Sequence, residues 1–356
     1  MAPKKRNKEN RTLPARWRFR NGSFCYQVPK GLEHEWDGKK EFKLGRTLTE
    51  AYRVWFERTR IDEDIATMSQ AFDRYLLEVV PDKAHSTQQS DIINIRFLRP
   101  VFGHLRPSEI LPVHAYRYHD IASKERGKVA AKHAVSTLRH VLSMCVKWGV
   151  INSNALIKQV TIENQPSRTR LVEDWEIQEC LNLKPKIHST AVDTIKLYLQ
   201  LKLMTGLTRI DILQLKLSDL KADGIHSMRQ KTAKKVGKRT IYKWTDELRE
   251  LVTEIKQLNP GRIGDVYLFV NRKGLPYFNE KTLKCNGFDS IWQRFMIRVL
   301  ELTKVSERFH EHDLRASVAS ESSSAEDASD RLNNSIETAR RVYRRKPIEV
   351  IPLKRK

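Results

Sequence analysis

Two short segments near the end of the chain carry side chains that could act on a phosphate ester. One reads H-D-L-R, from His312 to Arg315, and the other reads A-R-R-V-Y-R-R, from Ala339 to Arg345. Arginine binds phosphate oxygens through paired, permanently charged donors, and a tyrosine hydroxyl becomes a nucleophile when a nearby group takes its proton. Each segment alone is unspecific, because a chain with 11 His and 66 Lys and Arg residues contains such patterns by chance.

The charge of the chain favours a nucleic acid as its partner. The formal net charge is +23 and the pI is about 9.9, which is the electrostatic footprint of nucleic-acid binding. A protein of membrane surfaces would usually add a basic amphipathic helix or a lipidation signal, and we find neither. No apolar run is long enough to span a bilayer, and the basic start, 1–11, lacks the apolar stretch of a secretory signal. We therefore expect no membrane partner.

The cysteines and carboxylates argue against a metal site. The cysteines are scattered without C-x-x-C spacing, which fits a reducing compartment. No Asp/Glu cluster suggests a pair of metal ions. We expect neither metal nor other cofactor, and a metal-dependent nuclease is disfavoured.

The elements that must position these side chains indicate a mainly α-helical, multi-domain chain with small β-sheets (α+β). We expect the following segments: a basic flexible tail at 1–12, a small domain of three strands and a helix at 13–62, a helical domain at 63–163, a linker at 164–170, a mostly helical domain with a β-hairpin at 171–346, and a C-terminal tail at 347–356.

Local patterns support the first two domains. Trp17 and Phe19 alternate with arginines, as in a half-buried strand, and Asn21-Gly22 is a strong hairpin signal. A capping box at 47–50 opens a helix. The clearest helix of the chain runs from about 128 to 148 and ends before a glycine.

The last domain follows a polar linker, E-N-Q-P-S-R-T-R at 163–170. A buried helix is broken at Thr205-Gly206, and another helix begins after it. A hairpin is expected from strands at 225–232 and 238–242 with a turn at 234–237.

The order of motifs in this last domain resembles the catalytic domain of the tyrosine recombinases, in particular the phage integrases. That family's pattern has a helix ending in T-G-x-R with an acidic residue three positions later, a hairpin lysine, H-x-x-R, and a tyrosine nine residues beyond a His or Trp. The matching stretches are TGLTRIDILQLKLSDL, RQKTAKKVGKR, HDLR and LNNSIETARRVY. The resemblance covers about 170–345, and 13–165 fits the arm-binding and core-binding domains that usually precede it.

The resemblance implies a catalytic set. It places the nucleophile at Tyr343, the hairpin lysine at Lys231, and the H-x-x-R pair at His312 and Arg315. Asn334 takes the position usually held by His or Trp, where it can donate a hydrogen bond but cannot titrate near neutral pH.

The first arginine of the family pattern is displaced in this chain. Thr208 stands where T-G-x-R has its arginine, Arg209 follows one position later, and Asp211 matches the acidic position. One helical residue is a rotation of about 100°. We expect Arg209 to supply the guanidinium nonetheless, and the alternative is a disabled or sluggish enzyme.

The implied reaction cuts and rejoins DNA without metal or ATP. Two arginines would stabilise the charge that grows on the five-coordinate phosphorus. His312 would accept or orient the proton of the attacking tyrosine, and Lys231 would protonate the leaving 5′-hydroxyl. The product would be a 3′-phosphotyrosyl bond, which a second DNA strand can reverse because the ester energy is conserved.

The resemblance also implies partners and a setting. The expected partner is double-stranded DNA at the attachment sites of a phage or mobile element, bound by a homo-tetramer, with DNA-bending accessory proteins as further candidates. The expected location is the cytoplasm of a host bacterial cell, at the nucleoid. The tail at 346–356 has an apolar centre that would dock on a neighbouring protomer, or else it is a frayed end.

Other functions stay open at this point. A type IB topoisomerase uses a similar set of side chains, although the N-terminal domains favour an integrase. A DNA-binding architectural protein with a decayed catalytic set is the alternative from another class, and Thr208 and Asn334 are its support.

Overall fold

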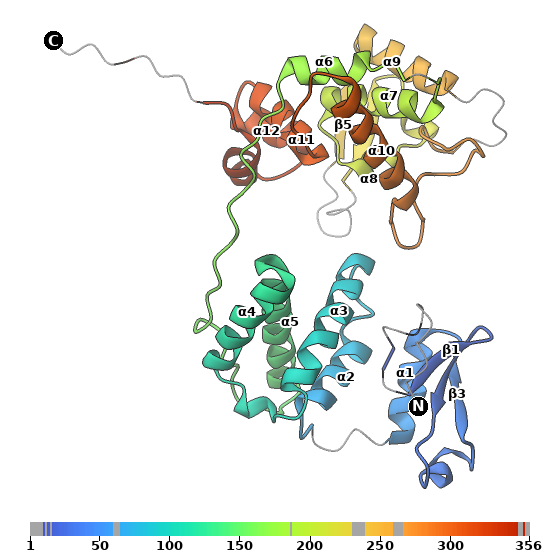
Figure 1. Ribbon diagram of the computed structural model, residues 1–356, viewed down its shortest axis with the longest axis vertical. Coiled ribbons are helices and arrows are strands. Elements are labelled where there is room, and N and C mark those ends of the chain that lie inside the picture. The colour runs from blue at the N-terminus through green and yellow to red at the C-terminus, as the bar shows by residue number, and fades with distance from the viewer. Residues whose placement is uncertain are drawn as a thin grey trace. The chain divides into compact units, whose positions relative to one another are not determined.

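The computed structural model describes residues 10, 13–14, 16–59, 65–185, 187–229, 239–258, 266–347 and 352. Over these residues the chain is mainly α-helical with two small antiparallel sheets, which confirms the expected fold class. The chain divides into two compact units, Met1–Gln165 and Pro166–Lys356 (Figure 1). The finer division into tails, an arm-type domain, a core-binding domain and a linker stays a prediction.

The first unit opens with a three-stranded antiparallel sheet in the order β1-β2-β3. Its elements are β1 (Trp17–Arg20), β2 (Ser23–Gln27), β3 (Glu41–Gly45) and α1 (Leu48–Thr59). The expected hairpin is confirmed, because Asn21 and Gly22 both have the left-handed backbone that this dipeptide favours, with φ of 49° and 70°. The expected helix start is also found, where the Thr47 hydroxyl accepts a hydrogen bond from the Glu50 amide at 3.2 Å.

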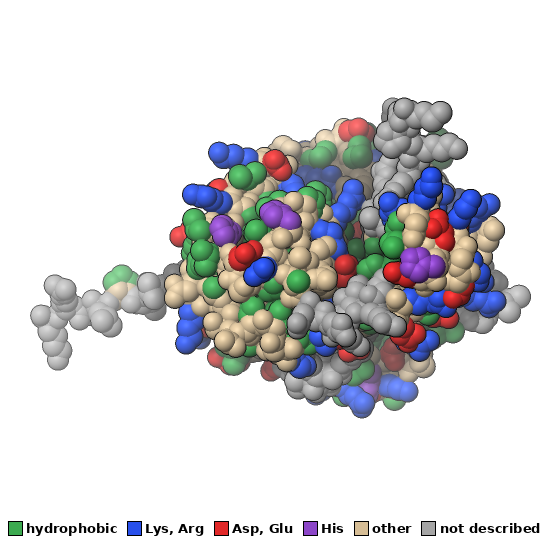
Figure 2. Space-filling view, turned by 90° about the horizontal axis from the view of Figure 1, so that it is seen from below, with side chains coloured by type: hydrophobic (Ala, Val, Ile, Leu, Met, Phe, Trp, Pro, Cys, Tyr) green, Lys and Arg blue, Asp and Glu red, His purple; other side chains and the backbone are tan. Residues whose placement is uncertain are grey.

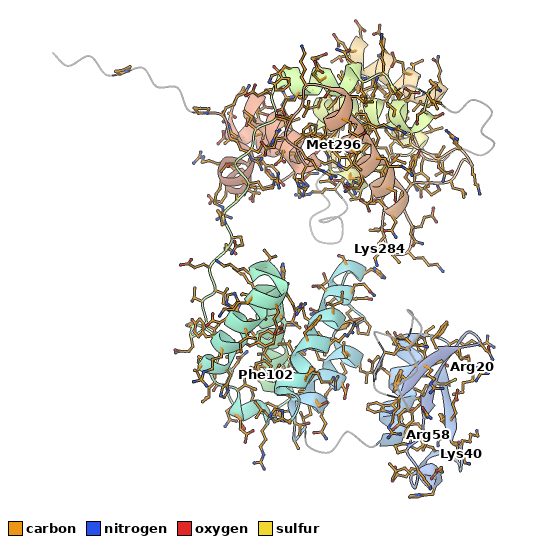
Figure 3. The ribbon with its side chains drawn as sticks, in the orientation of Figure 1. Arg20, Lys40, Arg58, Phe102, Lys284 and Met296 are labelled. Atoms are coloured by element: carbon orange, nitrogen blue, oxygen red, sulfur yellow. The ribbon has the colours of Figure 1, made fainter. Side chains whose placement is uncertain are left out.

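The rest of the first unit is helical. Its helices are α2 (Met68–Glu78), α3 (His85–Phe102), α4 (Pro112–Arg126) and α5 (Lys128–Lys147). Their apolar faces form one core, in which Phe102 is 2% exposed (Figure 3). The helix predicted from about 128 to 148 is α5, and Gly149 follows its cap with φ 76°.

The second unit is built around two buried helices, α7 and α11, which pack against each other. Its helices are α6 (Asp174–Asn182), α7 (Thr190–Thr205), α8 (Arg209–Leu213), α9 (Asp246–Gln257), α10 (Asn286–Leu302), α11 (Glu311–Glu321), α12 (Ala325–Leu332) and α13 (Ile336–Thr338), followed by the π-helical turn η5 (Ala339–Tyr343). Met296 of α10 lies fully buried in its core (Figure 3).

A two-stranded hairpin of β4 (Gly224–Met228) and β5 (Arg239–Lys243) completes the second unit. The predicted strands extend to Thr232 and begin at Lys238, but these ends and the turn at 234–237 lie outside the described residues. Lys231 lies there as well.

Positive charge is spread over the surface. On the face shown in Figure 2, Lys and Arg side chains are distributed around the rim and are interrupted by acidic side chains and histidines. Among the helices that the structure describes, none is long and apolar enough to cross a membrane. All four cysteines are free thiols.

Candidate active site

Helix α11 carries both residues of the H-x-x-R motif. Arg315 is only 1% exposed, whereas His312 lies on the exposed side of the same helix. Because small residues follow along α11, other elements can approach its backbone closely, and α7, α12 and η5 all pack against it. The helix therefore places one buried cation and one accessible imidazole within a single turn.

Arg315 connects three segments of the second unit. Its guanidinium donates to the backbone carbonyls of Gly206, after α7, and of Leu332, at the end of α12. Its Cζ lies 5.3 Å from the centre of the Tyr343 ring. Burial lowers the pKa of Arg315 and the nearby phenol of Tyr343 partly offsets this effect, but an arginine remains charged at neutral pH.

Tyr343 ends the π-helical turn η5, a type of turn that is frequent at functional sites. Its side chain is half-buried against a small cluster of apolar residues from α11, α12 and η5. The Ser320 hydroxyl of α11 donates to the Tyr343 carbonyl at 3.3 Å and accepts from the Arg345 amide at 2.8 Å. Helix α11 thus holds the backbone at Tyr343 and two residues after it.

The segment 331–334, which we call the acceptor turn, gathers donors from separate elements. Its first three carbonyls accept from Tyr242 of β5 at 2.9 Å, from Arg315, and from Arg229 after β4 at 2.7 Å. The end of α12 leaves these carbonyls without helical partners and carries the negative end of the helix dipole, so it attracts guanidinium groups.

Asn334 closes the acceptor turn. Its backbone is fixed by Ser329, whose hydroxyl donates to the Asn334 carbonyl at 2.8 Å and whose carbonyl accepts from the Asn334 amide at 3.1 Å. Its side-chain oxygen and nitrogen are buried, and neither has a hydrogen-bond partner within the described ranges. Unsatisfied buried amides are costly, so this side chain is suited to a ligand.

Arg209 occupies a different environment from Arg315. Thr208 caps α8, because its hydroxyl oxygen accepts a hydrogen bond from the Asp211 backbone amide at 3.5 Å. The same hydroxyl donates to the Asp211 carboxylate at 2.5 Å, and Arg209 is the first residue of the helix. The guanidinium of Arg209 forms ion pairs with Glu311 of α11 and Asp289 of α10. Its charge is therefore offset by two carboxylates.

Glu311 is the centre of a buried polar group. It accepts from the Tyr198 hydroxyl at 2.5 Å, and the Lys202 ammonium lies 3.7 Å away. Burial alone would raise the pKa of Glu311, but Lys202 and Arg209 outweigh it and hold the pKa below its ordinary value. Burial lowers the pKa of Lys202 to about 8, although Glu311 opposes this shift.

His312 stands one residue further along α11. Loss of hydration lowers its pKa, and the positive charges of Lys202 and Arg315 lower it further. Its imidazole is therefore neutral at pH 7 and able to accept a proton.

The fold around this site is shared with solved integrases. A lambda integrase tetramer bound to a Holliday junction superposes with a TM-score of 0.62 and 19% identity, over 97% of this chain and 99% of that one. The Tn1549 transposon integrase in complex with circular intermediate DNA matches with a TM-score of 0.58 and 13% identity, over 76% of this chain and 92% of that one. No family model matches the chain, and no curated protein matches it in sequence.

The chain has the fold of the tyrosine recombinases. Within this recombinase fold, the structure brings Arg315 together with Tyr343 and with the turn that carries Asn334. His312 lies one helical turn from Arg315 on α11. Arg209 lies in the carboxylate group around Glu311, and Lys231 follows the described end of β4 by three residues.

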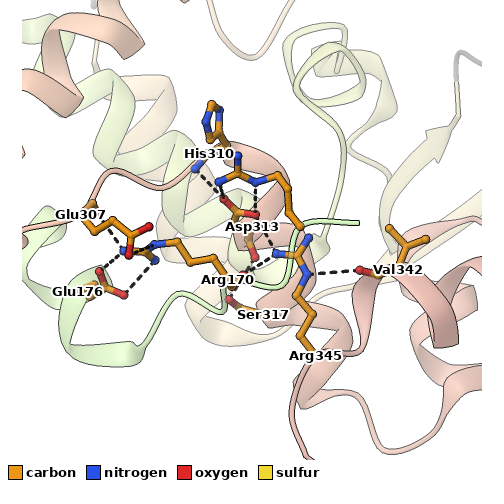
Figure 4. A network of polar contacts seen from close by, with 9 residues as sticks. Arg170, Glu176, Glu307, His310, Asp313, Ser317, Val342 and Arg345 are labelled. Atoms are coloured by element: carbon orange, nitrogen blue, oxygen red, sulfur yellow. Dashed lines mark hydrogen bonds and ion pairs between the residues drawn. The ribbon is translucent and has the colours of Figure 1, made fainter. Parts of the chain in front are cut away.

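A polar network holds the tyrosine segment of the recombinase fold in place (Figure 4). Asp313 of α11 is fully buried and accepts from Arg345 at 2.8 Å and from Arg168 at 2.9 Å. Arg345 also donates to the Arg170 carbonyl. Burial would raise the pKa of Asp313, but hydrogen bonds from both arginine side chains hold it below the ordinary value.

The sequence analysis missed several residues of this arrangement. Arg229, Glu311 and Asp313 each contact a predicted site residue or the segment that carries one. Asp313 and Glu311 lie inside or beside the H-D-L-R string, so their neighbourhood was available as a signal. For Arg229 the only signal was its position, two residues before Lys231 in the stretch RQKTAKKVGKR.

Proposed function

We propose that this chain is a tyrosine-type site-specific DNA recombinase that integrates or excises the DNA of a phage or other mobile element. The contact between Arg315 and Tyr343, in a chain with the recombinase fold, carries this proposal. A buried, charged guanidinium beside a phenol is suited to hold a phosphate oxygen where the phenol can attack.

In the proposed step, the Tyr343 oxygen bonds to the scissile phosphorus and the bond from phosphorus to the 5′-oxygen breaks. His312 takes the phenol proton, and Lys231 gives a proton to the 5′-oxygen. Arg315 stabilises the charge on a non-bridging oxygen. The products are a 3′-phosphotyrosyl bond and a free 5′-hydroxyl, and the reverse step with a second strand rejoins the DNA.

The second guanidinium expected from Arg209 needs a separate argument. A phosphate could reach this arginine only where Glu311 or Asp289 gives up its ion pair. Since carboxylates repel an approaching anion, the contacts of Arg209 favour a role in holding α8 against α10 and α11.

We further propose that the active form is a homo-tetramer on double-stranded attachment sites. The solved lambda integrase tetramer on a Holliday junction supports this assembly, and the net charge of +23 supports binding to DNA. The proposed setting is the nucleoid of a bacterial host, where DNA-bending accessory proteins would assist.

Covalent trapping tests the proposal. The full chain is mixed, in EDTA, with a nicked duplex that carries the attachment sequence mapped from the junctions of the element with its chromosome. We expect a protein–DNA adduct that survives denaturant and disappears in Tyr343→Phe. Adduct in Tyr343→Phe, or none in the unaltered protein, would contradict the proposal.

A DNA-binding architectural protein with a decayed site is the second candidate. Two features favour the architectural protein: the charge of Arg209 is neutralised, and Thr208 stands where the family has its first arginine. A recombinase needs more than one guanidinium at the phosphate. This candidate predicts tight, salt-sensitive DNA binding without any adduct.

A further inference from the structure

We propose that Arg229 supplies the second guanidinium of the phosphate clamp, in place of the arginine that Thr208 replaces. This inference rests on the proposed recombinase function. It concerns which side chain touches the scissile phosphate, and it assigns Arg229, which opens the RQKTAKKVGKR stretch but has no role in the family pattern given above.

The acceptor turn places Arg229 beside Arg315. The two guanidiniums donate to neighbouring carbonyls of this turn, Arg229 to Asn333 at 2.7 Å and Arg315 to Leu332. Their charges are close enough for Arg229 to lower the pKa of Arg315. Two like charges at one turn repel each other, and a bound phosphate would relieve that repulsion.

Arg315 and Tyr343 both lie next to the turn that Arg229 contacts. Arg229 directly follows β4 and precedes Lys231 by two residues in the sequence. Arg315 is in turn next to Tyr343. The end of β4 and α11 therefore meet at the acceptor turn, where they contribute the guanidiniums of Arg229 and Arg315.

Asn334 supplies an independent sign of a ligand at this place. It belongs to the acceptor turn, and both polar atoms of its buried amide lack a hydrogen-bond partner among the residues that the structure describes. An amide N–H can donate to a phosphate oxygen, which would satisfy the Asn334 side-chain nitrogen. The ligand that fits two guanidiniums and an amide donor is a phosphodiester of the DNA backbone.

Arg209 fits the clamp less well than Arg229. The acceptor turn contacts Arg229 and Arg315 through backbone carbonyls, which orient each guanidinium. The partners of Arg209 are the carboxylates of Glu311 and Asp289, which cancel its charge and would repel the phosphate.

A charge-neutral substrate separates a clamp residue from a structural one. Single-turnover adduct formation is measured at saturating DNA with the nicked duplex and with the same duplex carrying a methylphosphonate at the scissile position. We expect Arg229→Gln to slow the reaction on the phosphodiester by about 10²- to 10³-fold. On the methylphosphonate the loss should be under about tenfold, because the neutral group needs less charge compensation.

The control variants come from the same region. Arg239→Gln removes an exposed charge of the same hairpin, opposite Met228, and should leave both rates unchanged. Arg229→Lys keeps the charge without the paired donors, and it should lose less than Arg229→Gln on the phosphodiester. Arg209→Gln should lose activity equally on both substrates, since its role is structural.

Each outcome decides the inference. An equal loss on both substrates in Arg229→Gln, or no loss on either, overturns it and leaves the recombinase function standing. If Arg209→Gln instead loses much less rate on the methylphosphonate than on the phosphodiester, Arg209 is the clamp residue. An unaltered protein that forms no adduct overturns the proposed function, and the inference with it.

Discussion

At the scale of the residue, His312 is the group through which pH should control the reaction. Its pKa lies below the ordinary value of 6.5, because of lost hydration and the charges of Lys202 and Arg315. If it accepts the proton of Tyr343, the reaction needs neutral imidazole. We expect the single-turnover rate to fall on acidification, with its half-maximal point below pH 6.5.

Lys202→Met is the matched variant for this pH profile. It removes one positive charge and leaves Glu311 less neutralised, and both changes raise the pKa of His312. The acidic fall in rate should therefore begin at a higher pH, by up to about one unit. A half-maximal point above pH 6.5 in the unaltered protein, or one that does not move in Lys202→Met, would count against His312 as the proton acceptor.

Residue identities could be predicted only where the signal is local in sequence. His312, Arg315 and Tyr343 stand in short strings, and in the structure Arg315 lies beside Tyr343 and influences His312. The ion pair of Arg209 joins residues 102 positions apart, and the hydrogen bond of Arg229 joins residues 104 apart. Such partners are set by how α8, α11 and the hairpin pack, which no local pattern contains.

At the scale of the element, Gly206 sets how closely α7 approaches α12. It has φ 67°, and a Cβ there would lie 2.6 Å from the Leu332 side chain and 3.2 Å from that of Val318. We expect Gly206→Ala to cost about 2–4 kcal/mol in the free energy of unfolding, from overpacking and left-handed strain. Adduct formation should fall as well, because the Gly206 and Leu332 carbonyls hold Arg315.

Gly274→Ala is the control for this substitution. Gly274 has nearly the same φ, 71°, but a Cβ at this position would meet no atom within 4 Å. Gly274→Ala should therefore lower the free energy of unfolding only by the cost of the left-handed backbone, about 1–2 kcal/mol. Denaturant unfolding of the full chain measures both, and equal losses in the two variants would show that the contact with Leu332 is unimportant.

Elements were predictable where capping and turn chemistry mark them. The Asn-Gly hairpin, the capping box at 47–50 and the helix at 128–147 follow rules of backbone geometry that act within a few residues. The π-helical form of η5 and the donors to the acceptor turn carry no such mark. They depend on tertiary contacts of α11, and the sequence shows only that α11 is rich in small residues.

At the scale of the whole molecule, residues 168–170, at the start of the second unit, are bonded to the segment that follows Tyr343. Arg168 and Arg345 share the buried carboxylate of Asp313, and Arg345 also donates to the Arg170 carbonyl (Figure 4). A displacement of residues 168–170 would thus reach the chain two residues after Tyr343.

Arg345→Met should make residues 168–170 more accessible to protease. Arg345 has an 8% exposed side chain, and its loss removes the ties to Asp313 and Arg170 while Arg168 keeps its ion pair. We expect trypsin to cut after Arg168 and Arg170 about tenfold faster, equal to about 1.4 kcal/mol of local stability. Arg344→Met, at an exposed neighbouring position, should leave cutting unchanged. If both variants are cut at the rate of the unaltered chain, Arg345 does not hold residues 168–170 in place.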